Sequence, residues 1–448
     1  MSDFTKLRIG LIALARPTFD TALAAEMAAA GRAQLAATGC TLLGPQALIM
    51  SLEEAATAAQ ALAGQDLHLL VLLQASFADS TMTLALAKTV DAPLLLWAVP
   101  EERVGGRLRL NSLCGINLGG HALRRAGFRY DTIYAPPDDP AALAKIGPLA
   151  QAGRVRRLLA GTRIGVVGEH PAGFDSCGYD AANLRRRLGV DILPIALDSA
   201  FADMRAVGPE RTQPVRARLA PRLAGLEAVD QQALQGTLGV YVALAERVKT
   251  SGLSGLAVRC WPEFFTELGC AACGAMSMLS DEGTPCGCEA DVNGTITQFM
   301  LQALSDEPAF GADLVAVDPE RDAVILWHCG LAPLAMADPA ATPRATIHSN
   351  RRLPLLMEFP LKPGRVTAAR LSEATGELRL VIGTGEMVQA PPAFTGTTGA
   401  LRFDRPAVEI LDILLGEGLE HHISLTYGDH APALLALARL LDLPVLQL

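Results

Sequence analysis

Short apolar runs alternate with longer amphipathic segments through the first 150 residues, and this alternation limits the fold more than any other feature. Runs such as RIGLIAL at 8–14, HLLVLLQ at 68–74 and APLLLWAV at 92–99 have the length and apolar character of buried strands. Between them lie helix-like segments, such as the alanine-rich TALAAEMAAAGRAQLAATG at 21–39. Strands that alternate with helices form a mostly parallel sheet with both faces covered. We therefore predict an N-terminal α/β domain over 1–157.

A second segment with the same order of elements as the start of the chain follows at residue 163. RIGVVGEHPAGFD at 163–175 has the order of RIGLIALARPTFD at 8–20: a strand, a loop with Gly or Pro, and a helix. Two related domains in tandem would explain the similarity, and so would coincidence, because any parallel sheet begins in this way. In either case the sequence predicts a second α/β domain over 158–320.

The pattern changes at about residue 320. LPLLMEFPLKPGRVTAARLSE at 353–373 and GELRLVIGTGEMV at 376–388 contain β-branched and alternating runs with turns at PG and TGE. Such runs are typical of antiparallel strands. The predicted fold class is therefore α/β, with two tandem Rossmann-like parallel-sheet domains followed by a mixed, β-rich domain over 321–448.

Composition and charge argue against several classes of protein. The net charge of -9 disfavours nucleic acid as the main partner, because phosphate binding needs clustered Lys and Arg. No run approaches the roughly 18 to 20 apolar residues that span a bilayer, so we predict no membrane partner. The nine cysteines, without a secretion signal, fit the reducing cytoplasm. A phosphate-binding P-loop, a dinucleotide fingerprint and a G-x-S-x-G elbow are all absent from the sequence.

Five cysteines gather between residues 260 and 288, namely Cys260, Cys270, Cys273, Cys286 and Cys288. A structural zinc site prefers two C-x-x-C pairs on turns. Here the first pair lies in LGCAACGAMSML, which resembles a helix packed into a core, and the second is a tighter C-x-C. Buried cysteine packs as a small apolar residue. We interpret the cluster as packed thiols, with structural zinc and redox chemistry as the alternatives.

Carboxylates and imidazoles follow several of the predicted strands, at the edge where α/β sheets bind their ligands. The residues are Glu263, Glu289, Asp291, His328, His421 and His422. Taken singly, a Glu after a strand is usually a solvated cap, and a His in an apolar strand is usually hydrogen-bonded in the core. As a set, two or three carboxylates with one or two imidazoles suit a divalent ion such as manganese.

These segments resemble the L-fucose isomerase and L-arabinose isomerase superfamily. RCWPEF, GTPCGCEADVNGTIT and EGLEHHISLTYGD carry most of the likeness, and ASFADS, LLLWAVPEE, NSLCGINLGG and RIGVVGEHPAGF extend it over nearly the whole chain. The resemblance implies a metal-dependent aldose–ketose isomerase that uses Mn²⁺, with Co²⁺ or Mg²⁺ as other candidates. It also implies a homo-oligomer, a trimer or hexamer, in which a neighbouring subunit completes the site.

The resemblance assigns roles to the acidic residues. Glu263 matches a glutamate that binds the metal and exchanges the substrate proton. Glu289 matches the second carboxylate of the arabinose branch, whereas Asp291 matches that of the fucose branch. Glu267 competes with Glu263, because it lies 24 residues before Asp291, the spacing expected of the fucose branch. An ungapped alignment counted back from the second motif favours Glu263.

The resemblance also names imidazole ligands and sugar contacts. His422 matches the C-terminal metal ligand, and His328 matches a further His less closely. For the sugar we predict contacts from Gln74, Phe77, Asp79, Asn111 and His421. The alternative for Asp79 and Ser80 is that they cap the helix that begins at Thr81.

The chemistry explains why these residue types would be needed. Moving a carbonyl from C1 to C2 requires a proton to leave C2 and return to C1 through an enediol. A divalent ion can stabilise the developing charge while a carboxylate acts as the base. We therefore predict a metal-dependent aldose–ketose isomerase acting on a small sugar. A non-catalytic sugar-binding protein and a metal-dependent lyase or aldolase are the alternatives.

Overall fold

The computed structural model describes residues 4–448, which form two compact units. Unit 1 runs through Leu158 and also includes Pro432–Leu441. Unit 2 comprises Leu159–Ala431 and Asp442–Leu448. The second and third regions predicted from the sequence thus belong to one compact unit.

Unit 1 contains a five-stranded parallel sheet with the strand order β2-β1-β3-β4-β5. The strands are β1 (Arg8–Leu14), β2 (Thr41–Leu43), β3 (Leu69–Gln74), β4 (Leu94–Ala98) and β5 (Asp131–Tyr134). The helices are α1 (Thr21–Ala37), α2 (Leu52–Leu62), α3 (Ser80–Thr89), α4 (Ser112–Arg125), α5 (Pro140–Leu159) and α14 (Ala431–Leu441).

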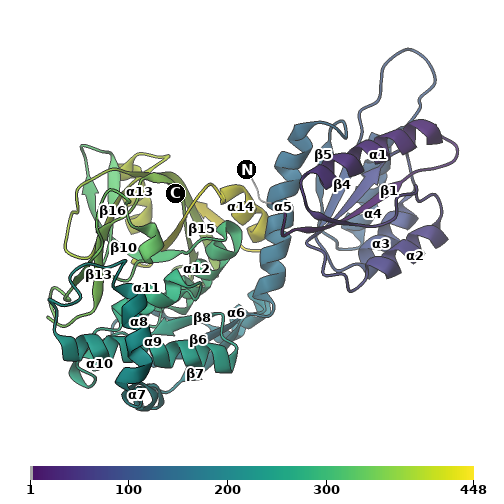
Figure 1. Ribbon diagram of the computed structural model, residues 1–448. Coiled ribbons are helices and arrows are strands. Elements are labelled where there is room, and N and C mark those ends of the chain that lie inside the picture. The colour runs from purple at the N-terminus through teal and green to yellow at the C-terminus, as the bar shows by residue number, and fades with distance from the viewer. Residues whose placement is uncertain (1–3) are drawn as a thin grey trace. The chain divides into compact units, whose positions relative to one another are not determined.

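The helices of unit 1 cover both faces of its sheet, as Figure 1 shows for α1 and α3. Successive side chains of a strand point to opposite faces. Leu72 accordingly packs in the core formed with α2, α3 and α4, while its neighbour Leu73 faces Gly31 of α1. Because both faces are buried, β3 is apolar throughout and does not alternate.

Short polar residues begin the helices of unit 1. Ser51 and Glu54 form a capping box at α2. Asp79 is the N-cap of α3, where its carboxylate accepts a hydrogen bond from the backbone N–H of Thr81 at 3.0 Å. The capping role that the sequence offered as the alternative for Asp79 is therefore present.

Unit 2 begins with a four-stranded parallel sheet of order β7-β6-β8-β9. Its strands are β6 (Arg163–Val167), β7 (Asp191–Ile195), β8 (Gly255–Val258) and β9 (Cys286–Cys288). Its helices are η1 (Asp175–Cys177), α6 (Ala181–Leu188), α7 (Leu197–Arg205), α8 (Pro209–Leu219), α9 (Gln231–Ser251), α10 (Glu263–Thr266), α11 (Cys273–Asp281) and α12 (Val292–Ser305). The order of these four strands repeats that of the first four strands of unit 1, so the similarity of the two openings extends to topology.

The remainder of unit 2 is a nine-stranded mixed sheet of order β12-β13-β16-β11-β10-β17-β14-β15-β18. Its strands are β10 (Phe310–Asp318), β11 (Ala323–His328), β12 (Arg344–Thr346), β13 (Leu356–Pro360), β14 (Gly364–Ser372), β15 (Arg379–Val388), β16 (Thr397–Phe403), β17 (His422–Tyr427) and β18 (Val445–Gln447). The short helix η2 (Leu334–Met336) and α13 (Ala407–Gly416) complete it. The predicted fold class, two parallel α/β sheets followed by a mixed β-rich region, is confirmed.

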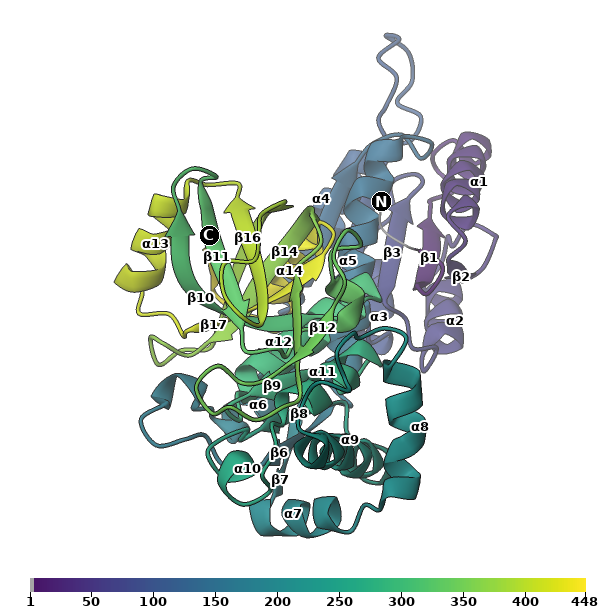
Figure 2. The ribbon, with the colours of Figure 1, turned by 60° about the vertical axis from the view of Figure 1, so that its left-hand side comes forward.

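Helix α12 lies between the two sheets of unit 2 (Figure 2). Ten of its 14 residues are buried, which is the pattern of a helix covered on every side. Two of its hydroxyls are hydrogen-bonded to the two sheets: that of Thr295 donates to the carbonyl of Leu256 in β8, and that of Thr297 accepts from the N–H of Leu371 in β14. The first turn of α12 is thereby fixed where the two sheets approach each other.

No helix among residues 4–448 is both long enough and apolar enough to cross a membrane.

The N-cap at Asp79 gives a first testable prediction. Asp79→Ala should lower the free energy of unfolding by about 1 kcal/mol, because an N–H of the first turn of α3 loses its acceptor. Asp79→Asn should restore most of the loss, since Asn caps equally well and the exposed ion pair with Arg16 is worth little. Urea unfolding of the three proteins measures the difference. An Asp79→Ala variant as stable as the parent would contradict the capping role.

Candidate active site

The carboxyl edge of the parallel sheet in unit 2 meets the mixed sheet at a cluster of polar side chains. Residues that follow β6, β8 and β9 come from the first sheet, and residues of β10, β11 and β17 come from the second. They are Cys177, Trp261, Glu289, Asp313, His328, His421 and His422. The carboxyl ends of parallel strands are where α/β sheets bind ligands, so the cluster occupies the expected edge.

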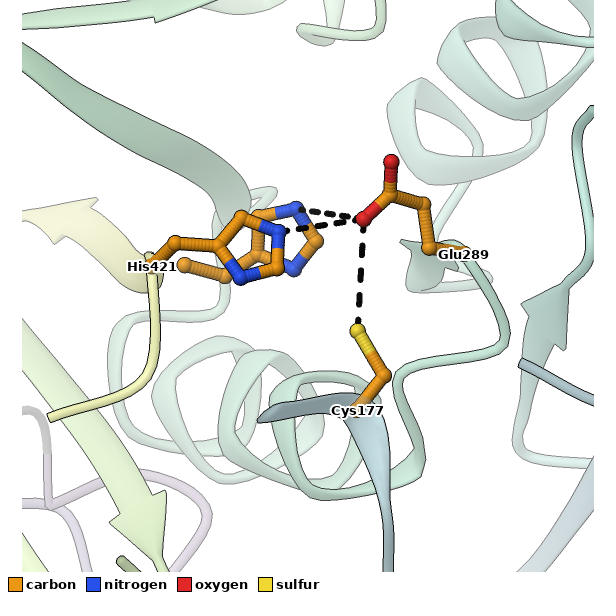
Figure 3. A group of neighbouring side chains, drawn as sticks. Cys177, Glu289 and His421 are labelled. Carbon is orange, nitrogen blue, oxygen red and sulfur yellow. Dashed lines mark hydrogen bonds and ion pairs between the residues drawn. The ribbon is translucent and has the colours of Figure 1, made fainter. Parts of the chain in front are cut away.

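One oxygen of Glu289 lies at the centre of the cluster (Figure 3). Its Oε2 is 3.0 Å from Nε2 of His421, 3.9 Å from Nε2 of His422 and 4.0 Å from Sγ of Cys177. The other oxygen, Oε1, accepts a hydrogen bond of 2.9 Å from the indole N–H of Trp261. Burial raises the pKa of Glu289, but the hydrogen bonds from His421 and Trp261 and the charge of His422 outweigh it and lower the pKa below its ordinary value. Glu289 is therefore a carboxylate at neutral pH, held by Trp261 at one oxygen.

His422 joins three carboxylates. Its Nδ1 is 3.0 Å from Oδ2 of Asp291, and its Nε2 is 3.3 Å from Oδ1 of Asp313. Burial alone would lower the pKa of His422, but the hydrogen bonds with Asp291 and Asp313 raise it well above the usual value. The ring contacts Asp291 through one nitrogen and presents the other to Asp313 and Glu289.

Both carboxylate oxygens of the buried Asp291 have partners within the protein. It is the N-cap of α12, with its Oδ1 accepting from the N–H of Gly294 at 2.8 Å, and its Oδ2 forms a buried ion pair with Nη1 of Arg370. Burial raises the pKa of Asp291, and the charge of Arg370 together with the hydrogen bond to His422 lowers it well below its usual range. Asp291 therefore orients His422 and the first turn of α12, and it has no free oxygen with which to act as a base.

Among the described residues, the remaining carboxylates of the cluster have no Lys or Arg partner. Within residues 4–448, Glu289 and Asp313 form ion pairs with histidines alone, although their side chains are only 14% and 24% exposed. Buried carboxylates without a compensating charge are costly. Two overlapping groups have the spacing to hold an ion: Cys177, Glu289, His421 and His422, and Asp313, His328 and His422. The donor set and its excess of negative charge therefore fit a divalent cation.

The backbone at Glu289 and Ala290 adopts the left-handed conformation, with φ of 58° and 56°. This conformation costs a residue with a Cβ about 1 kcal/mol or more, and residues that adopt it concentrate at functional sites. Here the two residues turn the chain from β9 directly into α12. The turn brings the Glu289 side chain into the cluster and leaves Asp291 in place to cap the helix.

Most of the predicted metal residues meet in this cluster, but Glu263 does not. Glu289, His328 and His422 belong to the two groups, and Asp291 contacts His422 from outside them. His421, which was predicted to contact the sugar, also belongs to one of the groups.

Glu263 instead forms a bidentate ion pair with Arg259 four residues earlier, with nitrogen–oxygen distances of 2.8 and 2.7 Å. Its competitor Glu267 is half exposed and lies 3.8 Å from Arg205. The metal and proton-transfer roles predicted for Glu263 thus find no support here, because α10 directs the carboxylate back to Arg259.

Four of the residues predicted to contact the sugar lie in unit 1. Gln74 is only 1% exposed, and its amide lies beneath the surface at the end of β3. Phe77 packs against Phe19, with ring centroids 5.7 Å apart. Asp79 caps α3, and Asn111 precedes α4 with a φ of 53°. Their sugar contacts stay predictions, and burial makes Gln74 the weakest of them.

Sequence reasoning missed Cys177, Asp313 and Arg370. Asp313 left a usable signal, because aspartate is depleted in strands and this one interrupts the run FGADLVAVD. Cys177 ends the short helix η1, and no recognisable sequence pattern surrounds it. Arg370 lies in an apolar strand, where a buried guanidinium requires an acidic partner that the sequence alone does not identify.

The five cysteines between residues 260 and 288 and Cys329 are buried thiols, in keeping with the packing interpretation. Cys260 and Cys288 have their sulfurs 2.8 Å apart, and those of Cys273 and Cys329 are 3.2 Å apart. Burial raises the pKa of Cys270 to about 12. Among residues 4–448, Cys177 is the one cysteine with the spacing of a metal-binding group.

Comparisons with known proteins identify the family of the chain. Residues 10–155 match the sequence model described as "Fucose/sulfoquinovose isomerase, N-terminal domain", and residues 357–448 match "L-fucose isomerase, C-terminal domain". A sulfoquinovose isomerase of Alkalicoccus urumqiensis is 34% identical over 374 residues, covering 83% of this chain and 84% of the relative. A sulfoquinovose isomerase of Priestia aryabhattai is 30% identical over 435 residues, covering 96% and 97%.

These matches identify the chain as an enzyme that interconverts a sugar aldose and its ketose. The chain belongs to the fucose/sulfoquinovose isomerase family, as the resemblance of its motifs predicted. A non-catalytic sugar-binding protein and a lyase are therefore no longer needed as alternatives.

The buried ion pair gives the second prediction. Arg370→Met should lower the free energy of unfolding by about 3–5 kcal/mol, because Asp291 would remain buried without its counter-charge. The double variant Asp291→Asn/Arg370→Met removes both charges and should lose less than the sum of the single losses. Denaturant unfolding of the four proteins measures the coupling. Additive losses would show that the two side chains do not act as a pair.

Proposed function

We propose that this chain is a divalent-metal-dependent isomerase that converts sulfoquinovose, or a closely related sulfonated aldohexose, into the corresponding ketose through an enediol. The relatives that align with most of its length carry the name sulfoquinovose isomerase. The observation that carries the metal dependence is the pair of buried carboxylates, Glu289 and Asp313, that lie beside His422 without a Lys or Arg partner in the described chain.

The proposed cation would lie beside His422, the residue that the two groups share, with Glu289 as a ligand from one group and Asp313 from the other, and with His421 and His328 beside them. Carboxylate oxygens together with imidazole suit Mn²⁺, and Co²⁺ or Mg²⁺ are the other candidates. When bound, such an ion polarises the substrate carbonyl and stabilises the negative charge of the enediol stage. Asp291 would support the site from outside, since it orients the ring of His422 through Nδ1.

Proton transfer is assigned to Glu289 and His421. Because its pKa is lowered, Glu289 is ionised and ready to take the proton from C2 and return it to C1. His421 donates from Nε2 to Glu289, while its Nδ1 is 2.8 Å from the hydroxyl of Ser176. With its ring held in this way, His421 is placed to carry the hydroxyl proton from O2 to O1. Taken together, the transfers return to the sugar one proton at C1 for the one lost at C2 and one at O1 for the one lost at O2, so aldose and ketose are isomers.

A third prediction tests this reaction. With sulfoquinovose in D₂O, the protein loaded with manganese should introduce deuterium at C2 of the aldose or C1 of the ketose. Glu289→Gln should lower kcat by roughly 100-fold or more, since a general base contributes about that much. Product analysis and NMR of the recovered sugars provide the measurement. Unchanged exchange by Glu289→Gln would assign the base elsewhere, with Glu263 as the next candidate.

A fourth prediction tests the metal. Chelator should abolish turnover, and manganese should restore it best. Asp313→Asn and His422→Gln should weaken Mn²⁺ binding by roughly 10-fold or more, because each removes a ligand. Cys270→Ser is the control and should bind as the parent does, since that thiol is buried away from the two groups. Zinc that stays bound and is lost with Cys270→Ser would contradict the assignment.

Three further expectations are part of the proposal. The family resemblance implies a homo-oligomer, either a trimer or a hexamer, and a site completed by a neighbouring subunit. The cysteine content is the basis for a location in the cytoplasm. None of the three enters the assignment of Glu289, Asp313 and His422, which come from one unit of one chain.

A further inference from the structure

Arg351 lies beside the candidate active site with its charge unpaired. It belongs to the segment between β12 and β13, and its guanidinium carbon lies 4.6 Å from the ring centroid of Trp261 and 5.3 Å from that of Phe265. An arginine within about 6 Å of an aromatic ring is attracted to its face. The side chain is thus held in place by two aromatic residues.

No carboxylate neutralises Arg351 within residues 4–448. Its one hydrogen-bond partner through the guanidinium is the ring of His348, 3.0 Å from Nη1. Burial and the charge of Arg351 lower the pKa of His348 to about 4, so the imidazole is neutral at physiological pH. Two other arginines of unit 2 differ in this respect, because Arg259 pairs with Glu263 and Arg370 pairs with Asp291.

Trp261 connects Arg351 to the reacting end of the site. The same indole that stacks with Arg351 donates its N–H to Oε1 of Glu289. Phe174 extends this aromatic wall, with its ring centroid 5.2 Å from that of Trp261 and 5.9 Å from that of His421. A free positive charge therefore lies one indole ring away from the carboxylate assigned to proton transfer.

We propose that Arg351 binds the sulfonate of the substrate and thereby makes the enzyme selective for an anionic sugar. This inference rests on the proposed function and adds the specificity-determining residue. A guanidinium presents a planar fork of N–H donors that matches the oxygens of an oxyanion. Because the stacking on Trp261 and Phe265 already orders the side chain, little conformational entropy is lost when the anion binds. The sugar would extend along the Trp261 wall with C1 and C2 at Glu289.

The test compares two sugars that differ only in the anionic group, sulfoquinovose and 6-deoxyglucose. Arg351→Met should raise KM for sulfoquinovose by roughly 10- to 100-fold, because charge-assisted hydrogen bonds are lost. It should leave kcat/KM for 6-deoxyglucose within a few-fold of the parent. Added salt should raise the KM of the parent for sulfoquinovose more than that of the variant, because salt screens the charge. Arg352→Met, which removes an exposed charge from the neighbouring residue, is the matched control and should behave as the parent.

The outcomes separate this inference from the proposed function. A parent enzyme that isomerises neutral sugars but not sulfoquinovose would overturn the proposed substrate, and one that isomerises no aldose would overturn the proposed reaction. If the parent uses sulfoquinovose and Arg351→Met affects both sugars equally, or neither, the assignment of Arg351 is wrong. Should Arg351→Met fail to fold, Arg351→Lys decides, since it keeps the charge but loses the fork: a higher KM for sulfoquinovose alone supports the inference, and an unchanged KM overturns it.

Discussion

The buried ion pair between Asp291 and Arg370 is the interaction on which the candidate site depends. Two opposite charges are removed from water in the interior of unit 2, which is costly unless further hydrogen bonds compensate. Asp291 makes two such bonds, because it caps α12 and holds Nδ1 of His422. One carboxylate therefore fixes the position of a helix, the orientation of an imidazole and the charge of an arginine.

The cluster separates residues that position from residues that react. Asp291, Trp261 and Ser176 each hold a partner: His422, Glu289 and His421 respectively. Each partner directs one atom toward the others. Oε2 of Glu289 lies near both Nε2 of His422 and Nε2 of His421. Such support is what a reactive group needs if its geometry is to be ready before substrate arrives.

Local patterns made the fold predictable, whereas contacts between distant segments did not follow from them. The run RIGLIAL coincides with β1 because both faces of a parallel strand are buried and its sequence is apolar throughout. Glu289 and His422 were predicted because residue types at strand ends, together with the family motifs, point to the same chemistry, and both lie in the cluster. Asp313 was missed because only the pairing of β10 with β17 brings it to His422. Glu263 lies apart from the cluster because its carboxylate pairs with Arg259, four residues earlier in the chain, and its predicted role stays a prediction.

The path of the last 17 residues has a consequence for how the chain is made. Pro432–Leu441 belong to unit 1, while Asp442–Leu448 return to unit 2, where β18 pairs with β15 and Leu448 is buried. Protein synthesis releases the amino-terminal segments first, and domains usually fold in that order. Here the first unit lacks a helix until residue 441 has left the ribosome, and the second lacks an edge strand until residue 447 has. Both units must therefore wait for the same short segment, and a premature stop before it would leave neither one complete.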